Sequence, residues 1–217
     1  MQMRLYGIIG AGGFGKEVMP IAEEMLCPSD QTGCEIVFVD ENRELDLING
    51  HRVISPDEFL ASDADKYFNI SIADYSIRER FARDFLAGNA KPFSITASNS
   101  VCMHGNLIGE GLILCAFTTI TSNAKIGRYF HANIYSYVAH DCVIGDFVTF
   151  APDVHCNGGV IVEDYAYIGT GAILKQGTSE QPIVVGRGAV VGMGAVVTKS
   201  VAPFATVVGN PAAPLRK

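Results

Sequence analysis

The sequence predicts two structural units of different class, an α/β unit followed by a β-solenoid. Residues 4–95 alternate short apolar runs with segments of helical periodicity. From about residue 99 the helical pattern gives way to an apolar residue at every sixth position. The chain has 217 residues, of which 48% are hydrophobic, and this is enough to bury a sizeable core. We therefore expect one unit over residues 1–95 and a second over residues 96–217.

The first unit is predicted to be a small parallel sheet with helices. Apolar runs at 4–10, 35–40 and 67–73 have the composition of strands. Helical spacing follows the first run, and Pro20 inside it predicts a kink. The apolar residues of this helix are Val18, Ile21, Ala22, Met25 and Leu26. A charged helix, "YSIRERFARDFLAG", follows the third run and ends on a glycine. Strands that alternate with helices are typical of βαβ units.

The second unit is predicted from its six-residue period. Thirteen consecutive hexad positions are apolar: Cys102, Ile108, Leu114, Ile120, Ile126, Ala132, Val138, Ile144, Phe150, Cys156, Val162, Ile168 and Leu174. Repeated apolar hexads indicate a β-solenoid, in which three hexads make one coil and the prism buries the first residue of each hexad. The period breaks at "QGTSEQP" and resumes at Val185, Val191 and Val197, so we expect that segment to loop out from a corner.

His140 and Asp141 interrupt the apolar stretch "YSYVAHDCVIG". Val138 takes an inward position of its hexad, so Ala139 points outward and the two polar residues fall at the next corner of the coil. An imidazole with a pKa near neutrality can accept a proton, and a neighbouring carboxylate can fix its tautomer. The pair is therefore a candidate catalytic dyad. The alternative is a solvated pair on a coil corner.

A glycine motif, Gly10-Ala11-Gly12-Gly13-Phe14-Gly15, follows the first predicted strand and opens a predicted helix. Main-chain amides at a helix start bind phosphate in this context. Asp40 ends the next strand, where a dinucleotide site has a carboxylate for the ribose. Because only about ninety residues are available, too few for two mononucleotide halves, a nucleotide-sugar fits this unit better than NAD.

Composition and charge exclude several classes of protein. The formal net charge of −7 argues against nucleic acid or an anionic membrane as a partner. The sequence has no run of eighteen uncharged apolar residues and no signal-peptide pattern, so we expect a cytoplasmic protein. The six cysteines show no C-x-x-C spacing, and we expect free thiols at Cys27, Cys34, Cys102, Cys115, Cys142 and Cys156.

The hexads and the glycine motif together resemble the left-handed β-helix acyltransferases that modify nucleotide-activated amino sugars. The likeness covers nearly the whole chain, through "HANIYSYVAHDCVIGDFVTFAP" (131–152), "VGMGAVVTKS" (191–200) and "GNPA" (209–212). Within the sugar O-acyltransferase and sialic acid O-acetyltransferase-like family, it is nearest to the O-antigen perosamine N-acetyltransferases. The resemblance implies an α/β Rossmann-like half domain followed by an all-β left-handed parallel β-helix of hexapeptide repeats.

The resemblance implies an enzyme of surface polysaccharide (lipopolysaccharide) biosynthesis. It would transfer acetyl from acetyl-CoA, a cosubstrate, to the amino group of a nucleotide-linked deoxy-amino-sugar similar to GDP-perosamine, by direct attack and without a permanently bound cofactor. It would be a homotrimer with an acetyl-CoA groove between adjacent prisms. A bacillosamine-type N-acetyltransferase, a sialic acid O-acetyltransferase, a noncatalytic β-helix binding protein and a zinc lyase are the alternatives. The sequence leaves open which nucleotide and which sugar carbon are involved.

Carried over residue by residue, the resemblance makes His140 the general base and Asp141 the carboxylate that orients it. It assigns acetyl-CoA binding to Thr149, Gly158, Gly169, Gly171, Ala172, Lys175, Gly192, Gly194 and Ala195, with Lys199 as a further candidate for the phosphates. The amide of Gly158 would face the thioester carbonyl. Nucleotide-sugar binding falls to Gly10, Gly12, Gly13, Phe14, Gly15, Asp40, Glu41, Ala73 and Asp74. Bacillosamine-type relatives carry a second histidine nine residues after the base, where this chain has Thr149.

A zinc site is the weaker alternative for the histidines. His131, His140 and His155 lie on consecutive predicted coils, and γ-class carbonic anhydrases bind zinc through histidines of two β-helix subunits. The H-x-x-x-x-H pair of that family is missing from this chain, so no metal is expected.

Overall fold

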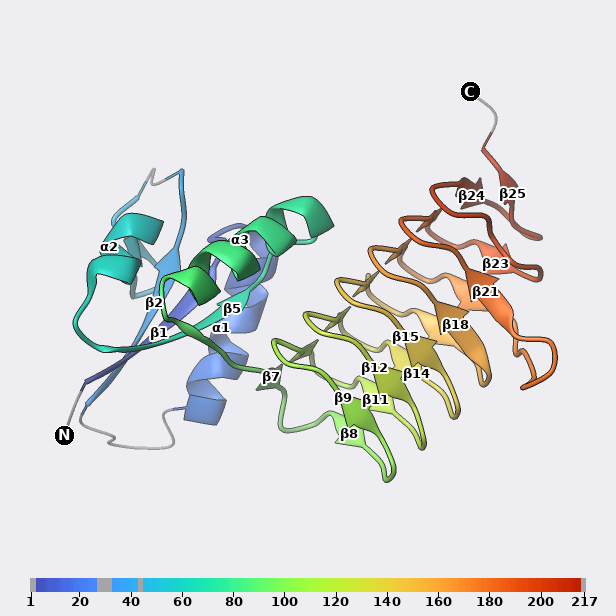
Figure 1. Cartoon of the computed structure of the whole chain (residues 1–217), viewed down its shortest axis with the longest axis horizontal. Coiled ribbons are helices and arrows are strands. Elements are labelled where there is room, and N and C mark those ends of the chain that lie inside the picture. Colours follow the sequence, from blue (N-terminus) through green and yellow to red (C-terminus); the bar gives the residue numbers. More distant parts are fainter. Residues whose placement is uncertain (1–2, 27–32, 43–44, 216–217) are drawn as a thin grey trace. The chain divides into compact units, whose positions relative to one another are not determined.

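The structure, a computed structural model, describes residues 3–26, 33–42 and 45–215. The chain divides into two compact units, Met1–Ser98 and Asn99–Lys217. The first combines helices with a mostly parallel sheet, and the second consists of short, mostly parallel strands in stacked coils (Figure 1). Both predicted fold classes are confirmed.

A six-stranded sheet in the order β3-β4-β2-β1-β5-β6 forms the first unit. Its centre is the parallel trio β1 (Arg4–Ile9), β2 (Cys34–Val39) and β5 (Asp65–Ile70), which confirms the three predicted strands. Three short strands of this sheet were not predicted, because two to four residues give too little periodicity to recognise: β3 (Leu47–Ile48), β4 (His51–Ile54) and β6 (Lys91–Pro92). The two-residue strand β7 (Ile95–Thr96) was missed for the same reason and is not part of this sheet. Of the neighbouring pairs, only β3–β4 is antiparallel.

The helices of the first unit are α1 (Gly13–Leu26), α2 (Pro56–Ala61) and α3 (Tyr75–Ala87). Helix α1 includes Pro20 and buries Gly15, Val18, Met19 and Ala22. The predicted apolar face was wrong at Met25, which is 37% exposed, because Met19 instead occupies the buried face. Helix α2 was not predicted, although Ser55 and Glu58 form a capping box at its start. Helix α3 ends at Gly88, as predicted.

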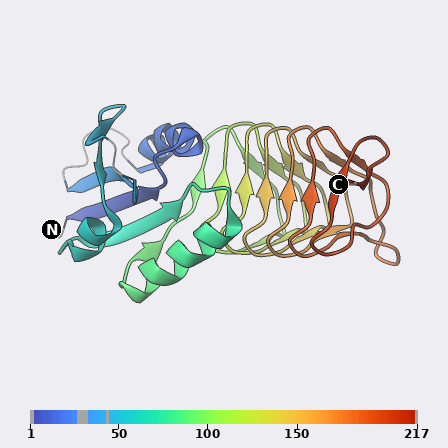
Figure 2. The ribbon, with the colours of Figure 1, turned by 90° about the horizontal axis from the view of Figure 1, so that it is seen from above.

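The second unit is a parallel β-helix whose strands form three sheets, one on each side of the coil (Figure 2). Side 1 contains β10 (Ile113–Leu114), β13 (His131–Ala132), β16 (Thr149–Phe150), β19 (Tyr167–Ile168), β22 (Val190–Val191), β24 (Thr206–Val208) and β25 (Ala213–Pro214). Side 2 contains β8 (Val101–Cys102), β11 (Thr119–Ile120), β14 (Tyr137–Val138), β17 (His155–Cys156), β20 (Ile173–Leu174) and β23 (Val196–Val197). Side 3 contains β9 (Leu107–Ile108), β12 (Lys125–Ile126), β15 (Val143–Ile144), β18 (Val160–Val162) and β21 (Ile183–Val185).

The predicted coil of three hexads is confirmed by the strand register. Ile126 pairs with Ile144, and Ile144 pairs with Val162, so equivalent residues of successive coils stack on each other. The hexad residues from Leu114 to Leu174 are buried and form one continuous core. The prediction was wrong for Cys102 and Ile108, which are exposed, because they belong to the first coil and have a stacked coil on one side only. The predicted break lies between β20 and β21, as expected.

Two composition-based predictions can be compared with the described residues. Cys34, Cys102, Cys115, Cys142 and Cys156 are free thiols, as predicted, whereas Cys27 lies outside the described residues. Among the helices that the structure describes, none is both long and apolar enough to cross a membrane.

Candidate active site

The corner between sides 2 and 3 carries the predicted dyad. Two residues occupy this corner in each of three successive coils: Ser122 and Asn123, His140 and Asp141, and Gly158 and Gly159. We call these six residues the 2–3 corner. The second residue of each pair has a positive φ, 61° at Asn123, 59° at Asp141 and 67° at Gly159. Asn, Asp and Gly adopt this left-handed conformation at the lowest cost, so Asp141 fits the turn and presents its carboxylate beside His140.

His140 and Asp141 are hydrogen-bonded and open to solvent. Nδ1 of His140 lies 2.8 Å from Oδ2 of Asp141, and the two side chains are 57% and 63% exposed. An ionised carboxylate can only accept, so in the neutral imidazole this contact places the proton on Nδ1 and leaves the lone pair on Nε2. The pair can therefore take a proton from a reactant that reaches Nε2.

The imidazole of His140 lies against Gly158 of the next coil. A Cβ atom on Gly158 would stand 2.6 Å from both Cε1 and Nε2 of the ring, so a side chain at this position would displace the imidazole. The neighbouring Gly159 donates its N–H to the carbonyl of His140 at 3.0 Å. The structure thus brings together three predicted site residues, His140, Asp141 and Gly158.

Asn157 precedes Gly158 and is held by side chains that the sequence reasoning missed. Its Oδ1 accepts from the hydroxyl of Tyr137 at 2.9 Å, and its Nδ2 donates to the carbonyl of Leu174 at 2.8 Å. Its main-chain carbonyl accepts from the thiol of Cys142 at 3.2 Å. The Cys142 sulfur also touches that of Cys156 at 3.9 Å. This contact and burial together raise the pKa of Cys156. The eighteen-residue period could have placed these residues on adjacent coils, but it says nothing about the direction of their side chains.

The other proposed acetyl-CoA residues lie away from the dyad in the chain. Gly169, Gly171 and Ala172, and one coil later Gly192, Gly194 and Ala195, form the corner between sides 1 and 2. The side chains of Ala172 and Ala195 are fully buried in the core, so only the main chain can meet a ligand there. Lys175 follows β20 and Lys199 follows β23, and both are exposed.

Thr149 is not brought to His140 within one chain. It lies on β16 of side 1, which is opposite the 2–3 corner of the triangular coil, and its side chain is buried. A role beside the dyad therefore requires Thr149 from another copy of the chain.

The three histidines considered for zinc do not converge. His131 is buried on side 1, whereas His155 lies on side 2 and has its Nε2 2.9 Å from Oδ1 of Asp153. Among the described residues, no group of three or more His, Cys, Asp or Glu side chains is arranged to hold a metal ion.

In the first unit, the glycines of the motif differ in their surroundings. A Cβ atom on Gly15 would stand 1.9 Å from the carbonyl oxygen of Gly10, so Gly15 is required for packing. A Cβ atom on Gly12 or Gly13 would meet nothing within 4 Å, so these two positions face open space. Oδ2 of Asp40 accepts the Ala11 N–H at 2.8 Å and thereby joins the glycine loop to the end of β2.

Two pockets adjoin Asp40. One of about 280 Å³ is lined by Gly10, Val39, Asp40, Glu41, Asn42, Ile72, Ile77 and Phe81. The other, of about 370 Å³, is lined by Ala11, Gly12, Lys16, Asp40, Asn42, Leu45, Ile48 and Val53. The structure thus brings Gly10, Gly12, Asp40 and Glu41 to one region of the unit. Sequence reasoning missed Lys16, which directly follows the glycine motif and lines the second of these pockets.

Two of the predicted nucleotide-sugar residues, Glu41 and Asp74, also make hydrogen bonds within the first unit. Glu41 binds Arg80 through both carboxylate oxygens at 2.8 Å, and this hydrogen bonding lowers the pKa of Glu41. Asp74 caps α3, and its hydrogen bonds from the Ser76 hydroxyl and the Ile77 amide lower its pKa. Ala73 is exposed, and Phe14 is partly buried at the start of α1.

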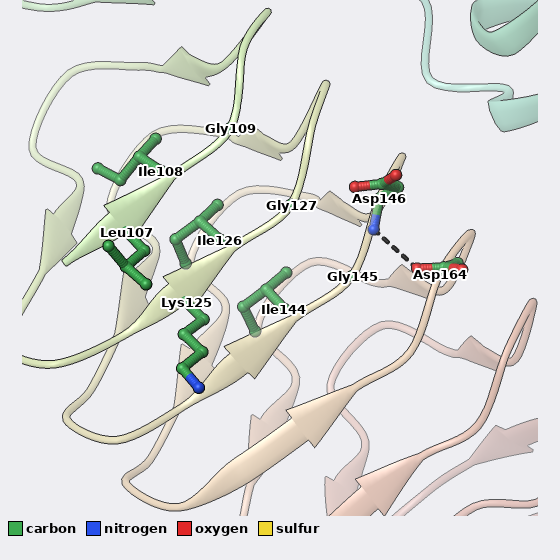
Figure 3. Close-up of a pocket in the computed structure, with 10 residues that line it drawn as sticks. All are labelled: Leu107, Ile108, Gly109, Lys125, Ile126, Gly127, Ile144, Gly145, Asp146 and Asp164. Carbon is green, nitrogen blue, oxygen red and sulfur yellow. Dashed lines mark hydrogen bonds between the residues drawn. The ribbon is translucent and has the colours of Figure 1, made fainter.

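A further groove of about 470 Å³ runs along side 3 (Figure 3). Its lining includes the repeating residues Ile108, Ile126 and Ile144 and the glycines that follow them. Oδ1 of Asp164 accepts the Asp146 N–H at 2.9 Å, and Asp146 also pairs with Arg128. These carboxylates hold successive coils together, and the groove contains none of the predicted site residues.

Comparison with known proteins gives matches to the first unit and to the whole chain. Residues 7–85 match the PglD N-terminal domain family. The chain is 49% identical to GDP-perosamine N-acetyltransferase of Escherichia coli O157:H7, over 99% of this chain and 98% of that protein. The structure of WeeI from Acinetobacter baumannii AYE matches with a TM-score of 0.94 at 48% identity, over 98% of this chain and 100% of that one.

A second solved structure shows the fold with a ligand bound. The acetyltransferase domain of PglB from Neisseria gonorrhoeae FA1090, in complex with acetyl coenzyme A, matches with a TM-score of 0.87 at 28% identity, over 98% of this chain and 100% of that one. This likeness confirms the predicted left-handed β-helix. The chain therefore belongs to the predicted family of left-handed β-helix sugar acetyltransferases that includes GDP-perosamine N-acetyltransferase.

Proposed function

We propose that this protein transfers the acetyl group of acetyl-CoA to the amino group of a GDP-linked perosamine-type sugar. The observation that carries the proposal is the exposed His140–Asp141 dyad on the β-helix of a chain that is, over nearly its full length, 49% identical to a GDP-perosamine N-acetyltransferase. The pockets around Asp40 give the first unit room for the nucleotide, with the Gly12 loop and Lys16 available to its phosphates.

His140 acts as the general base in this reaction. The neutral amine of the sugar attacks the carbonyl carbon of the thioester, and a C–N bond forms while the carbonyl electron pair moves to oxygen. Nε2 of His140 takes one proton from the amine nitrogen, and Asp141 stabilises the resulting imidazolium. The C–S bond then breaks, and the CoA thiolate receives that proton from Nε2. His140 returns to its neutral form, and no acyl-enzyme is required.

The main-chain amide of Gly158 is our candidate donor to the oxyanion. Gly158 packs directly against the imidazole, so its amide belongs to the same small region as the base. An amide fixed by the coil needs no reorganisation when negative charge develops on the thioester oxygen, which is the condition for effective oxyanion stabilisation.

The proposed assembly is a homotrimer with each site between two prisms. Both dyad side chains are more than half exposed, so one chain supplies an open half of a site. Thr149 and the corner between sides 1 and 2 face other directions from the 2–3 corner and become available only from a neighbouring copy. Head-to-tail contacts of this kind close into rings. Light scattering should give three times the chain mass of 23.2 kDa, and a monomer at micromolar concentration would contradict this site.

The test is acetyl transfer to a set of nucleotide-linked 4-amino sugars. Purified protein is incubated with acetyl-CoA and GDP-perosamine, or with UDP- or dTDP-linked 4-amino sugars, and thiol release and product mass are followed. We expect turnover with GDP-perosamine and at least tenfold lower kcat/KM with the others. GDP-mannose, which has no amine, is the control for hydrolysis. Equal turnover of a UDP-linked sugar would overturn the GDP assignment, and absence of any amide product would overturn the proposed reaction.

A further inference from the structure

We infer that Asn157 is a positioning residue for this reaction, held by Cys142 and Tyr137 so that the Asn157–Gly158 peptide supports the imidazole of His140. The inference rests on the proposed function, because it concerns the same base. It adds three side chains that do not touch the reacting atoms and act through Gly158 and His140.

The polar groups of Asn157 are all engaged. Its side-chain oxygen accepts from Tyr137 at 2.9 Å, and its side-chain nitrogen donates to Leu174 at 2.8 Å. Its main-chain N–H donates to the same Leu174 carbonyl at 3.4 Å, and its main-chain carbonyl accepts from Cys142 at 3.2 Å. Asn157 is therefore fixed by hydrogen bonds to the coil before it and to the coil after it. A solvent-exposed corner residue could be held without such bonds.

The Cys142 thiol sets the direction of the Asn157–Gly158 peptide. Cys142 is fully buried in the core, so the Asn157 carbonyl that it binds points into the prism. In a trans peptide the carbonyl and the N–H point in opposite directions, and among the described residues the cis peptide is at Asn210–Pro211. The N–H of Gly158 therefore points out of the prism at the corner where the imidazole lies.

The same peptide carries the surface on which the imidazole rests. The ring of His140 lies so close to Gly158 that even a methyl group would not fit between them. The far end of Gly158 is fixed too, since its carbonyl accepts the Gly177 N–H at 3.0 Å. A rotation of the 157–158 peptide would therefore shift the ring and turn the amide away together. Misplacements of about 1 Å at a reacting group can cost up to a hundredfold in rate.

Tyr137→Phe and Cys142→Ala each remove one side-chain support of Asn157, and Cys142→Ala has two matched controls. Tyr137→Phe deletes one hydroxyl from a partly exposed ring. Cys142→Ala removes the thiol, Cys142→Ser restores a donor, and Cys156→Ala deletes a neighbouring thiol that has no bond to Asn157. With acetyl-CoA and GDP-perosamine, we expect kcat to fall roughly fivefold to thirtyfold in Tyr137→Phe and Cys142→Ala. KM for acetyl-CoA should change less than twofold, Cys142→Ser should recover most of the rate, and Cys156→Ala should keep it.

A readout that needs no turnover accompanies the kinetics. The Cε1–H resonance of His140 in a ¹H–¹³C spectrum reports the ring's surroundings, and it should shift in Tyr137→Phe and Cys142→Ala but not in Cys156→Ala. Tyr137→Phe should add no further loss in an Asn157→Ala background, because both changes break the same bond. Equal losses of thermal stability and rate in Cys142→Ala and Cys156→Ala would overturn the inference. An unchanged His140 resonance in Tyr137→Phe would overturn it as well.

Failure of the proposed function is seen separately. If the parent protein acetylates none of the amino sugars, the proposed reaction fails while the resonance still reports whether Asn157 positions the ring. If the parent is active and the variants keep both its rate and its His140 resonance, the positioning inference alone fails.

Discussion

Two corners of the β-helix share the same backbone conformation but carry different kinds of side chain. The 2–3 corner holds a positive φ with Asn123, Asp141 and Gly159, residues that adopt it readily. The corner between sides 3 and 1 holds the same conformation with Tyr129, Phe147 and Tyr165. Bulky residues rarely adopt a positive φ, so an energetic cost at this second corner has to be offset.

Stacking offsets that cost at the 3–1 corner. The ring centroids of Tyr129 and Phe147 are 5.1 Å apart, those of Phe147 and Tyr165 are 5.8 Å apart, and Arg187 lies over Tyr165 at 4.5 Å. This corner is closed by a continuous column of side chains. The 2–3 corner replaces the column with an exposed dyad and two glycines. A solenoid can therefore carry a stabilising column of side chains at one corner and an exposed candidate dyad at another without any change in its coil.

The first prediction gives the largest effect at the 2–3 corner. His140→Ala should lower kcat by roughly a hundredfold to ten-thousandfold, the usual contribution of a general base, and leave KM for acetyl-CoA nearly unchanged. Because the side chain is 57% exposed, the unfolding midpoint should hardly move. The matched control is His155→Ala, which removes another imidazole paired with a carboxylate, and it should keep activity within threefold. Comparable losses of kcat in His140→Ala and His155→Ala would contradict the role of His140 as the general base.

The second prediction tests the opposite corner. Phe147→Ala should destabilise the protein by about 3–5 kcal/mol, because it removes a buried ring from the middle of the column. Urea unfolding measures this, and kcat per folded molecule should stay within twofold of the parent. A large loss of kcat in fully folded protein would mean that the 3–1 corner also contributes to catalysis.

Gly158→Ala supplies the third prediction, since it adds one methyl group to the 2–3 corner. The new Cβ would occupy space now taken by Cε1 and Nε2 of His140, so the imidazole must move. We expect kcat to fall roughly tenfold to a hundredfold. In a His140→Ala background the same change should cost little more, because the displaced ring is gone. If the kcat losses of Gly158→Ala and His140→Ala were fully additive in the double variant, the loss in Gly158→Ala would not come from displacement of the imidazole.

The contrast between corners also shows the limits of prediction from sequence. The hexad period alone determines which residues face inward and that His140 stacks near Gly158, eighteen residues later. The period treats all three corners alike. The prediction that His140 and Asp141 are catalytic therefore rested on the chemistry of an imidazole beside a carboxylate and on the family resemblance. The support of Asn157 by Tyr137 and Cys142 was out of reach, because it depends on side-chain directions between coils. The exposure of Ile108 was not predicted, because the repeat pattern looks the same in the first coil as in coils that are covered on both sides.

The last prediction extends the contrast to the glycine motif of the first unit, where two glycines three residues apart have different tasks. Gly12→Val puts a side chain where a Cβ meets nothing within 4 Å, so the fold should tolerate it while the phosphates of the nucleotide-sugar lose their close approach. We expect KM for the sugar to rise roughly tenfold, with KM for acetyl-CoA unchanged. Gly15→Ala forces a Cβ against the carbonyl of Gly10 and should instead lower unfolding stability by about 1–3 kcal/mol. Steady-state kinetics, calorimetry and circular dichroism on both variants separate the two effects. Normal sugar-nucleotide binding in folded Gly12→Val, or a selective loss of acetyl-CoA binding, would assign the loop to another use.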